Sequence, residues 1–313
     1  MKDVISVLIP VYNTSAYLRE CLNSILNQSY PHTQIVIVDD GSTDNSLSIA
    51  REYESKHQQV EVYHQENMGV ATARNNLLSK VKGDYTIFVD SDDWIEPRAL
   101  EFLLKTLKKN KADIAYCSKV TKEQNHISIE ESWTYEKLVY EFLCHKRIDG
   151  SLCNKLIRSD LLTGKQFHTS VFYGEDALFF WQILKSKVKI VITNEQLYHY
   201  RSNPLSLSRQ TWSPDRKGTC HIVWTSICED VARDWPQYLY IAQARLALEN
   251  MFGLYFAAKS GYKYDQHIKL RQECIRAYLP QIRKSQLASP THYICACILS
   301  RCYFLGKLIA MIK

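Results

Sequence analysis

The feature that most constrains the fold is an alternation of short β-branched runs with amphipathic segments, from Val4 to about Ser118. The strand candidates are Ser6 to Pro10, Gln34 to Asp39, Val60 to His64, Tyr85 to Val89 and Ile114 to Ser118. Apolar residues recur at helical spacing from Leu18 to Leu26, and Pro97 is expected at the first position of another helix. Strands that alternate with helices predict βαβ units, and therefore an α/β fold with a doubly wound, mostly parallel sheet.

The rest of the chain differs from this alternating part. Residues 119 to 213 hold mixed candidates, around Cys153 to Ile157, Asp176 to Lys185 and Lys189 to Thr193. From residue 214 onward the pattern predicts mostly helix, broken near Pro236, Gly261, Pro280 and Pro290. We therefore expect a domain over 1–213, with halves of about 1–118 and 119–213, and a mainly helical C-terminal region over 214–313.

Composition and charge exclude several classes of protein. With 46% apolar and 23% charged residues, the chain resembles neither a disordered nor a multipass membrane protein. Residues 214–313 hold 14 Lys/Arg against 7 Asp/Glu, so of the net charge of +6 this region carries +7 and the first 213 residues −1. Ten scattered cysteines lack the spacing of a zinc site and are expected to be reduced thiols of a cytosolic protein. The chain begins in a strand-like run, so no signal peptide is expected.

Acidic side chains follow two of the predicted strands. One strand ends with Asp39 and Asp40, and another is followed by Asp90, Asp92 and Asp93. Open α/β sheets bind ligands at the carboxyl ends of their strands. Three carboxylates within four positions repel one another unless a cation lies among them, and their oxygens suit Mg²⁺ or Mn²⁺. The alternative is that Asp, Ser and Gly only turn the chain and cap the next helix, which is an equally good interpretation of Gly41, Ser42 and Asp44.

A metal bound at such a site would support the departure of a nucleoside diphosphate, because it neutralises charge on the leaving oxygens. Asn67, Gly69 and Arg74 could add a phosphate or ribose contact, since glycine lets the backbone approach a ligand. A solvated surface arginine is an equally good interpretation of Arg74.

At this point the sequence resembles the family 2 inverting glycosyltransferases, which have the GT-A fold and act in bacterial surface-polysaccharide synthesis. The matching segments are Ser6 to Asn13, Ile37 to Asp44, Asn67 to Asn75, Phe88 to Trp94 and Tyr173 to Trp181. They fall in the family's order over roughly residues 4 to 200. One such segment is weak support, but five in order are specific.

The resemblance implies a set of donor-binding residues. Pro10, Tyr12 and Asp40 match positions that hold the nucleobase, with Tyr12 as a stacking ring and Asp40 as acceptor of an imide N–H. Uridine is the expected base, although thymidine and guanosine also have an N–H there. The full set expected to bind the nucleotide-sugar is Pro10, Tyr12, Asn13, Asp40, Asn67, Arg74, Asp90 and Ser91.

The resemblance also implies the metal site and the base. Asp92 is expected to bind Mn²⁺ or Mg²⁺ directly, with Asp90 nearer the ribose or sugar, and Asp93 could take part. Asp176 matches the catalytic base, and Glu175 would bind the acceptor or be structural. A purely structural role at the start of an apolar helix would account well for one carboxylate, but less well for two in succession. Asp176 would remove the acceptor's proton in a single in-line displacement.

Three further residues are weaker candidates for acceptor or diphosphate contacts. Lys155 could face either ligand, or could be a surface lysine. His199 and Arg201 begin a segment, running through Ser208 and Arg209, that resembles the family's loop over the donor. A histidine in a strand is more often structural. The processive members' Gln-x-x-Arg-Trp motif and membrane spans are absent, so one sugar is expected to be added per encounter.

The C-terminal region predicts a surface contact. The stretch from Tyr293 to Ile312 is apolar but interrupted by Arg301, which argues against a bilayer span. A basic amphipathic helix at the inner face of the cell membrane would bring the enzyme to a glycan or lipid-linked glycan acceptor. A helix packed on the catalytic domain or in a homodimer is an equal alternative. Nucleic acid is not expected as a partner, because no binding motif accompanies the charge.

Two other functions remain open from the sequence. A sugar-nucleotide nucleotidyltransferase has a similar fold, but its glycine-rich phosphate loop would replace the Pro10 to Asn13 segment, which has no glycine. A nucleotide-sugar-binding subunit without catalysis is disfavoured by Asp92 and Asp176, although a sequence does not demonstrate turnover.

Overall fold

The computed structural model describes residues 2–120, 129–203 and 212–306, which form two compact units. The first, here the sheet unit, comprises Met1–Leu138, Gly150–Thr169 and Phe179–Asn203. The second, here the helical unit, comprises Val139–Asp149, Ser170–Leu178 and Pro204–Lys313. The expected domain boundary after residue 213 stays a prediction, since units defined by contacts need not be independent domains.

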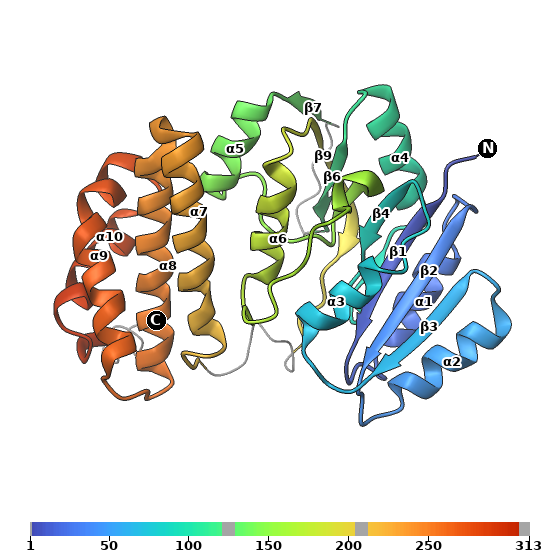
Figure 1. The fold of residues 1–313 in the computed structure, drawn as a ribbon, viewed down its shortest axis with the longest axis horizontal. Coiled ribbons are helices and arrows are strands. Elements are labelled where there is room, and N and C mark those ends of the chain that lie inside the picture. Colours follow the sequence, from blue (N-terminus) through green and yellow to red (C-terminus); the bar gives the residue numbers. More distant parts are fainter. Residues whose placement is uncertain (1, 121–128, 204–211, 307–313) are drawn as a thin grey trace. The chain divides into compact units, whose positions relative to one another are not determined.

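The sheet unit is built on nine described strands that alternate with helices (Figure 1). The strands are β1 (Ile5–Val11), β2 (Thr33–Asp40), β3 (Val60–Gln65), β4 (Tyr85–Phe88), β5 (Trp94–Ile95), β6 (Ile114–Lys119), β7 (Glu130–Trp133), β8 (Lys155–Arg158) and β9 (Ile190–His199). Their order is β3-β2-β1-β4-β8-β6-β9-β5, with β7 paired to β9. Strands β1 to β4 are parallel, and β8, β5 and β7 pair antiparallel with their neighbours, so the sheet is mixed.

This strand order fixes the position of a ligand site. The chain moves outward from β1 to β2 and β3, and then returns to place β4 on the other side of β1. Strand order therefore reverses between β1 and β4, and ligands of doubly wound sheets bind at the carboxyl ends of the strands at such a point. Residues 12–14 after β1 and residues 89–93 after β4 lie at this edge of the sheet.

Helices cover the sheet because their apolar stripes need burial. They are α1 (Leu18–Leu26), α2 (Ser46–Lys56), α3 (Val70–Leu78) and α4 (Ala99–Lys109), with a short 3₁₀ helix, η1 (Ser159–Leu162). Helices α5 (Tyr135–Cys144) and α6 (Glu175–Leu184) contribute residues to both units. One prediction was wrong: α4 begins at Ala99, so Pro97 lies before the helix and not at its first position.

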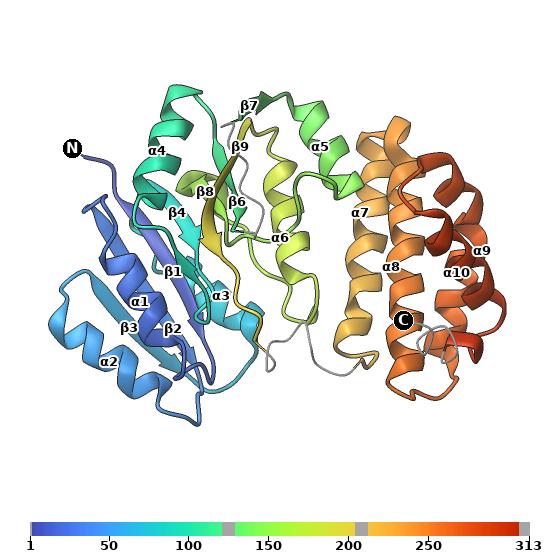
Figure 2. The same cartoon turned by 180° about the vertical axis from the view of Figure 1, so that it is seen from behind.

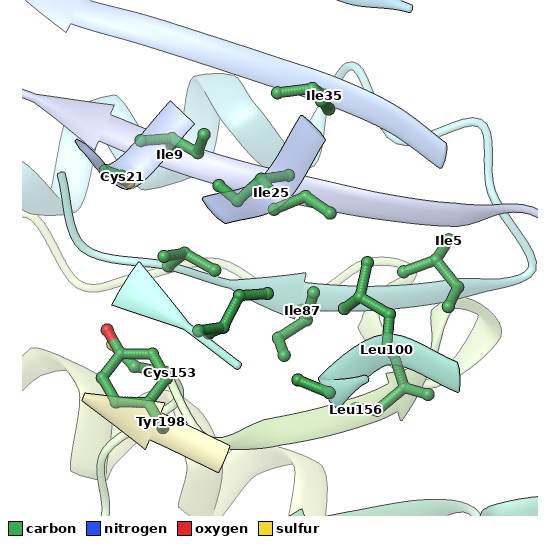
Figure 3. Close-up of a cluster of buried hydrophobic side chains, with 14 of the residues drawn as sticks. Ile5, Ile9, Cys21, Ile25, Ile35, Ile87, Leu100, Cys153, Leu156 and Tyr198 are labelled. Atoms are coloured by element: carbon green, nitrogen blue, oxygen red, sulfur yellow. The ribbon is translucent and has the colours of Figure 1, made fainter. Parts of the chain in front are cut away.

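One large hydrophobic core lies between the sheet and helices α1, α2 and α4 (Figure 3). The odd-numbered residues of β1, such as Ile5 and Ile9, point into it, as do Cys21 and Ile25 of α1 and Leu100 of α4. Alternate residues of a strand face opposite sides, so Leu8 and Phe88 lie on the other face of the sheet. There Phe167 contacts Phe88 edge-on at 5.8 Å and stacks on Phe179 of α6 at 4.0 Å.

The helical unit contains the long C-terminal helices, seen side by side in both views (Figures 1 and 2). These are α7 (Cys220–Asp234), α8 (Leu239–Lys259), α9 (Gln266–Ser285) and α10 (Pro290–Arg301), with the 3₁₀ turns η3 (Lys217–Thr219) and η4 (Pro236–Tyr238). A break was expected at Pro280, but this proline lies inside α9. Packing of Ile275 and Ile282 in the core of the unit offsets the hydrogen bond that a proline removes.

A buried arginine holds part of the helical unit together. Arg271 of α9 is 5% exposed, and its guanidinium donates to Asn250 Oδ1 of α8 at 2.9 Å and to the Gly218 carbonyl at 2.6 Å. Burial lowers the pKa of Arg271. Because it contacts two separate elements, this side chain fixes η3 against α8 and α9.

The cysteines and the apolar helices can also be compared with the sequence predictions. All ten cysteines lie in the described ranges and are free; Cys21, Cys117, Cys144 and Cys153 are buried, and the other six are partly exposed. None of the helices in the described part of the chain is both long and apolar enough to cross a bilayer.

Candidate active site

The loops after β1 and β2 are joined by polar contacts. The Asn13 amide donates to Ser42 Oγ at 3.0 Å, and Asn13 Oδ1 accepts from the Thr43 amide at 2.8 Å. Asp44 accepts from the Ser15 amide through one oxygen and from the Ser46 amide through the other. These contacts are enough to explain Ser42 and Asp44 as residues that shape the loops. Asn13 likewise links the two loops.

Tyr12 extends from this junction. Its side chain is 49% exposed, whereas Pro10, two residues earlier, lies in β1 beside Val38 of β2. An exposed ring at the carboxyl end of a strand is available to stack on a flat ligand. Tyr12 has this geometry.

Asp40 at the end of β2 anchors the loop before α3. It is 4% exposed, and its carboxylate accepts from Gln65 Nε2 at 2.7 Å, the Met68 amide at 2.9 Å and the Gly69 amide at 2.9 Å. Asn67 is exposed in the same loop. A carboxylate has about four acceptor positions, so three hydrogen bonds leave capacity for a ligand N–H.

The acidic turn, residues 90–93, follows β4 and touches the loop after β1. Ser91 accepts from Thr14 Oγ1 at 3.0 Å, which brings the two loops into contact. Asp90 Oδ1 lies 3.3 Å from Arg74 Nη2, and Asp90 Oδ2 accepts from the Cys153 thiol at 3.0 Å. Arg74 is buried, with its guanidinium over the Phe167 ring at 5.6 Å, so it is not the solvated surface arginine of the alternative interpretation.

Asp92 and Asp93 lie in different environments. Asp92 is half-buried, and its Oδ2 accepts from Asn203 Nδ2 at 2.9 Å. Asp93 is 2% exposed, and its two oxygens accept from the Tyr198 hydroxyl at 2.6 Å and the Arg201 amide at 2.8 Å. Asp93 therefore ties the acidic turn to the end of β9.

The pKa values of Asp92 and Asp93 in this turn are both raised. Burial, together with the charge of Asp90, raises the pKa of Asp92. The same two causes raise the pKa of Asp93 to about 7. Negative charge thus accumulates at this edge of the sheet, where a bound cation would relieve it.

The weaker candidates lie among protein partners. Arg201 has its guanidinium over the rings of Trp94 at 4.5 Å and Tyr17 at 5.0 Å, and it forms an ion pair with Glu20. His199 stacks on Trp94 at 4.6 Å and contacts Glu96. Their described contacts support the turn from within the protein, while Ser208 and Arg209 lie outside the described residues.

Lys155 is fully buried, which corrects the alternative that it is a surface lysine. Its ammonium donates to the Ser151 carbonyl and to Asn154 Oδ1, and it lies over the rings of Tyr116 and Phe180 at 5.0 Å each. These contacts satisfy the charge inside the sheet unit.

Glu175 and Asp176 occupy the first turn of α6, as the sequence predicted. Glu175 is 8% exposed, whereas Asp176 is half-buried and its Oδ1 accepts from the Ala177 amide at 2.8 Å. The preceding turn is held by Thr219, whose hydroxyl accepts from the Phe172 and Tyr173 amides at 3.2 and 3.0 Å. Phe172 and Tyr173 are 48% and 38% exposed, so they offer aromatic surface to a ligand, while Phe179 and Trp181 are buried.

Comparison with known proteins places the chain in a family. The model of Glycosyl transferase family 2 matches residues 6–163, which include every acidic strand end described above. This chain belongs to family 2 of the glycosyltransferases. The resemblance seen in the sequence is therefore confirmed.

Relatives of this family 2 chain include glycosyltransferases GlyA and GlyG of Streptococcus pneumoniae serotype 4. The chain is 31% identical to GlyA over 93% of its own length, but spans only 40% of GlyA. It is 31% identical to GlyG over 69% of its length and 77% of GlyG. A shorter match, 35% identical over 45% of the chain and 22% of the relative, is to chondroitin synthase of Escherichia coli.

Solved structures share the fold. TarS 1-349 of S. aureus, in complex with UDP-GlcNAc, has a TM-score of 0.69 at 20% identity, covering 98% of this chain and 91% of that one. The mannosyltransferase PcManGT from Pyrobaculum calidifontis, in complex with GDP-Man and Mn²⁺, has a TM-score of 0.61 at 19% identity, covering 96% and 87%. The expected GT-A type fold with a helical C-terminal region is confirmed.

Sequence reasoning on this family 2 chain missed the groups that support the acidic turn. Cys153, Tyr198 and Asn203 donate hydrogen bonds to Asp90, Asp93 and Asp92, respectively. Each is 63 to 111 residues away in sequence from its partner. The available signals were weak: Cys153 begins one of the mixed candidate segments, and Tyr198 and Asn203 lie beside and within the segment that begins at His199.

Asp39 was noted in the sequence as an acidic strand end, but its structural role was not predicted. It is fully buried, and its Oδ2 accepts from the Ser42 amide at 3.2 Å and contacts His64 Nδ1 at 2.8 Å. It therefore sets the turn that follows β2, on which the Asn13 junction depends.

The backbone at Gly41 leaves no room for a side chain in this family 2 chain. We therefore predict that Gly41→Ala lowers the stability of the protein. Its φ is +70°, and an added Cβ would lie 2.6 Å from the Asn67 amide nitrogen. Backbone strain and the clash together should destabilise the protein by about 2–4 kcal/mol. Chemical denaturation measures this change. The matched control is Gly164→Ala, with φ of +73° and open space at the Cβ, which should cost about 1–2 kcal/mol. Equal losses for the two variants would show that the contact with Asn67 is unimportant.

Proposed function

We propose that this chain transfers a sugar from a nucleotide-sugar, most simply a UDP-sugar, to an acceptor hydroxyl with inversion of configuration and with a divalent cation. The observation that carries the proposal is the placement of Asp90 and Asp92 at the point where strand order reverses, next to the loop of Tyr12. Ligands of this sheet architecture bind there. Family membership favours glycosyl transfer over nucleotidyl transfer.

The donor's base and ribose would contact the ends of β1 and β2. Tyr12 would stack on the base, and Asp40 would accept its N–H while holding the 65–69 loop. Asn13, Asn67, Arg74, Asp90 and Ser91 would complete the donor site. Among the structural neighbours, TarS is in complex with UDP-GlcNAc and PcManGT with GDP-Man, so both uracil and guanine are to be tested.

The acidic residues of the turn fit a divalent cation that is held mainly by the phosphate oxygens of the donor. Among the residues that the structure describes, no three His, Cys, Asp or Glu side chains form a ready metal cage. Mg²⁺ and Mn²⁺ are commonly held by one or two carboxylates together with phosphate oxygens and water. Asp92, assisted by Asp90, would supply such a pair, and burial together with the charge of Asp90 raises the pKa of Asp92. Bound there, Mn²⁺ or Mg²⁺ would stabilise the leaving diphosphate.

The protein's own groups would perform the remaining work. Asp176 would accept the proton of the attacking hydroxyl through a carboxylate oxygen, and the exposed faces of Phe172 and Tyr173 would contact the acceptor. The buried Glu175 would hold the start of α6. Arg74, held against Phe167, would orient Asp90.

The acceptor is proposed to be a glycan or lipid-linked glycan of a bacterial surface polysaccharide. Chondroitin synthase, among the relatives, is named for a polysaccharide. The chain would act on the cytoplasmic side of the cell membrane as a peripheral protein, brought there by its basic C-terminal region, and a homodimer is the alternative use of that region.

A thermal-shift series tests donor and metal together. UDP, TDP and GDP are each added with Mn²⁺ or with EDTA, at about 100 times the dissociation constant. A nucleotide that binds the folded form at this level stabilises it by about 2.7 kcal/mol, which raises the melting temperature by roughly 5 °C. We expect the largest shift for UDP with Mn²⁺ and a smaller one with EDTA. Absence of a shift with all three nucleotides would contradict the proposed function, and equal shifts with EDTA would contradict metal dependence.

A further inference from the structure

The helical unit exposes large apolar side chains at the end of α10. Phe304 is 70% exposed, Leu305 is 40% exposed, and Tyr264, from the turn between α8 and α9, is 47% exposed. We call these three residues the aromatic tip. Leaving such side chains in water forgoes about 25 cal/mol for each Å² of apolar surface, so a contiguous group of them indicates a contact surface.

The aromatic tip is held in place by ring contacts and hydrogen bonds within the helical unit. The rings of Tyr264 and Phe304 are stacked at 6.3 Å, and the Tyr264 hydroxyl donates to Gln272 Oε1 at 3.2 Å. Next to both rings, the buried Tyr303 donates from its hydroxyl to the Tyr262 carbonyl at 2.9 Å. The end of α10 is thereby fixed against the turn between α8 and α9.

Exposed basic side chains lie close in sequence to the residues of the aromatic tip. Lys263 directly precedes Tyr264, Lys259 ends α8, and Arg301 ends α10, and all three are exposed. None of them has an ion-pair partner among the residues that the structure describes. The adjacent Asp265 is engaged as the N-cap of α9, accepting from the His267 and Ile268 amides and the Tyr262 hydroxyl.

The wider charge of this part of the chain has the same sign. Residues 250–313 contain ten Lys/Arg against two Asp/Glu, a balance of +8. After Gly306 the sequence continues Lys-Leu-Ile-Ala-Met-Ile-Lys, which adds two lysines and five apolar residues but no acid. This stretch of the sequence therefore carries a net positive charge as well as the residues of the aromatic tip.

We propose that the aromatic tip is the docking surface of this protein for an anionic lipid bilayer, with Phe304 and Leu305 inserting at the headgroup level and Lys259, Lys263 and Arg301 facing lipid phosphates. This inference rests on the proposed function only in placing the acceptor at a membrane. Aromatic rings with basic neighbours are typical of membrane interfaces. A symmetric contact with a second copy would bring the same basic side chains together and so oppose itself.

Vesicle flotation of the full chain tests the inference. Vesicles of phosphatidylcholine alone are compared with vesicles that also contain phosphatidylglycerol. The double variant Phe304→Ser/Leu305→Ser should lower the bound fraction about tenfold or more, and Lys263→Glu/Arg301→Glu should abolish the preference for anionic vesicles. The control is Ile222→Ser on α7, since Ile222 is 50% exposed but lies outside the aromatic tip. This control should bind as the parent does.

Two outcomes would overturn the inference. One is binding that is equal for neutral and anionic vesicles and unaffected by the tip variants. The other is a change of sedimentation coefficient in Phe304→Ser/Leu305→Ser without any change in flotation, which would assign the aromatic tip to a second copy. Neither outcome touches the donor-binding test, because flotation is measured without nucleotide. All the substituted side chains are exposed, so melting temperatures are expected to match the parent's.

Discussion

Replacing Asp92 with asparagine is expected to lower the rate of sugar transfer about 10³-fold, because the variant loses the charged ligand that we propose for the cation, and cation stabilisation of a leaving group is worth several kcal/mol. Asparagine has nearly the same shape and still presents an oxygen to Asn203, so the fold should be retained. The measurement is kcat/KM over a Mn²⁺ titration, with UDP binding followed by calorimetry. Affinity for UDP should fall in the presence of Mn²⁺ and stay unchanged in EDTA.

The control for Asp92→Asn is the same substitution at Asp113. Asp113 precedes β6 at the opposite, amino-terminal edge of the sheet, where it forms an ion pair with Arg158 at 2.8 Å. Its loss should leave transfer within about twofold of the parent, since exposed ion pairs contribute little. If Asp92→Asn and Asp113→Asn behave alike, the assignment of Asp92 as the metal ligand is wrong.

Replacing Asp176 with asparagine is expected to lower kcat by about 10²–10⁴-fold while donor affinity remains within about twofold of the parent's. Asparagine removes the ability to accept a proton, but it is as good as aspartate at a helix start. A residue that only began α6 would therefore tolerate this change. Rapid-quench measurement of product formation, with UDP affinity measured separately, distinguishes the two roles.

Glu175→Gln provides the comparison within the same turn. Glu175 is buried, so its replacement should reduce stability more than it reduces kcat. A larger loss of kcat in Glu175→Gln than in Asp176→Asn would move the base to Glu175. If both variants keep the kcat of the parent, neither carboxylate at the start of α6 is the catalytic base.

Much of the sheet unit was predictable because local sequence determines it. The five predicted strands correspond to β1, β2, β3, β4 and β6, since each is a short β-branched run between turns. The helical spacing of apolar residues from Leu18 to Leu26 likewise predicted α1, whose observed bounds are the same. Local rules failed where tertiary packing overrides them, as at Pro280, which remains within a helix whose neighbouring residues are buried.

The candidate site was predictable in its charged residues but not in their supports. Asp90 and Asp92 could be recognised because they follow a strand end. The burial of Lys155 between Tyr116 and Phe180 could not, because it depends on contacts between distant segments. The contacts of Arg201 with Tyr17 and Trp94 likewise come from sequence-distant parts of the chain.

The hydrogen bonds from Tyr198 and Arg201 to Asp93 have a consequence for biosynthesis. They join residues 105 and 108 positions apart, so the turn after β4 obtains its final partners only after β9 has left the ribosome. The N-terminal strands can pair earlier, during translation, because β1, β2 and β3 are close in sequence. A nascent chain halted before Ile190 would thus hold most of its parallel strands with an unfinished acidic turn, and the proposed donor site would be completed late in synthesis.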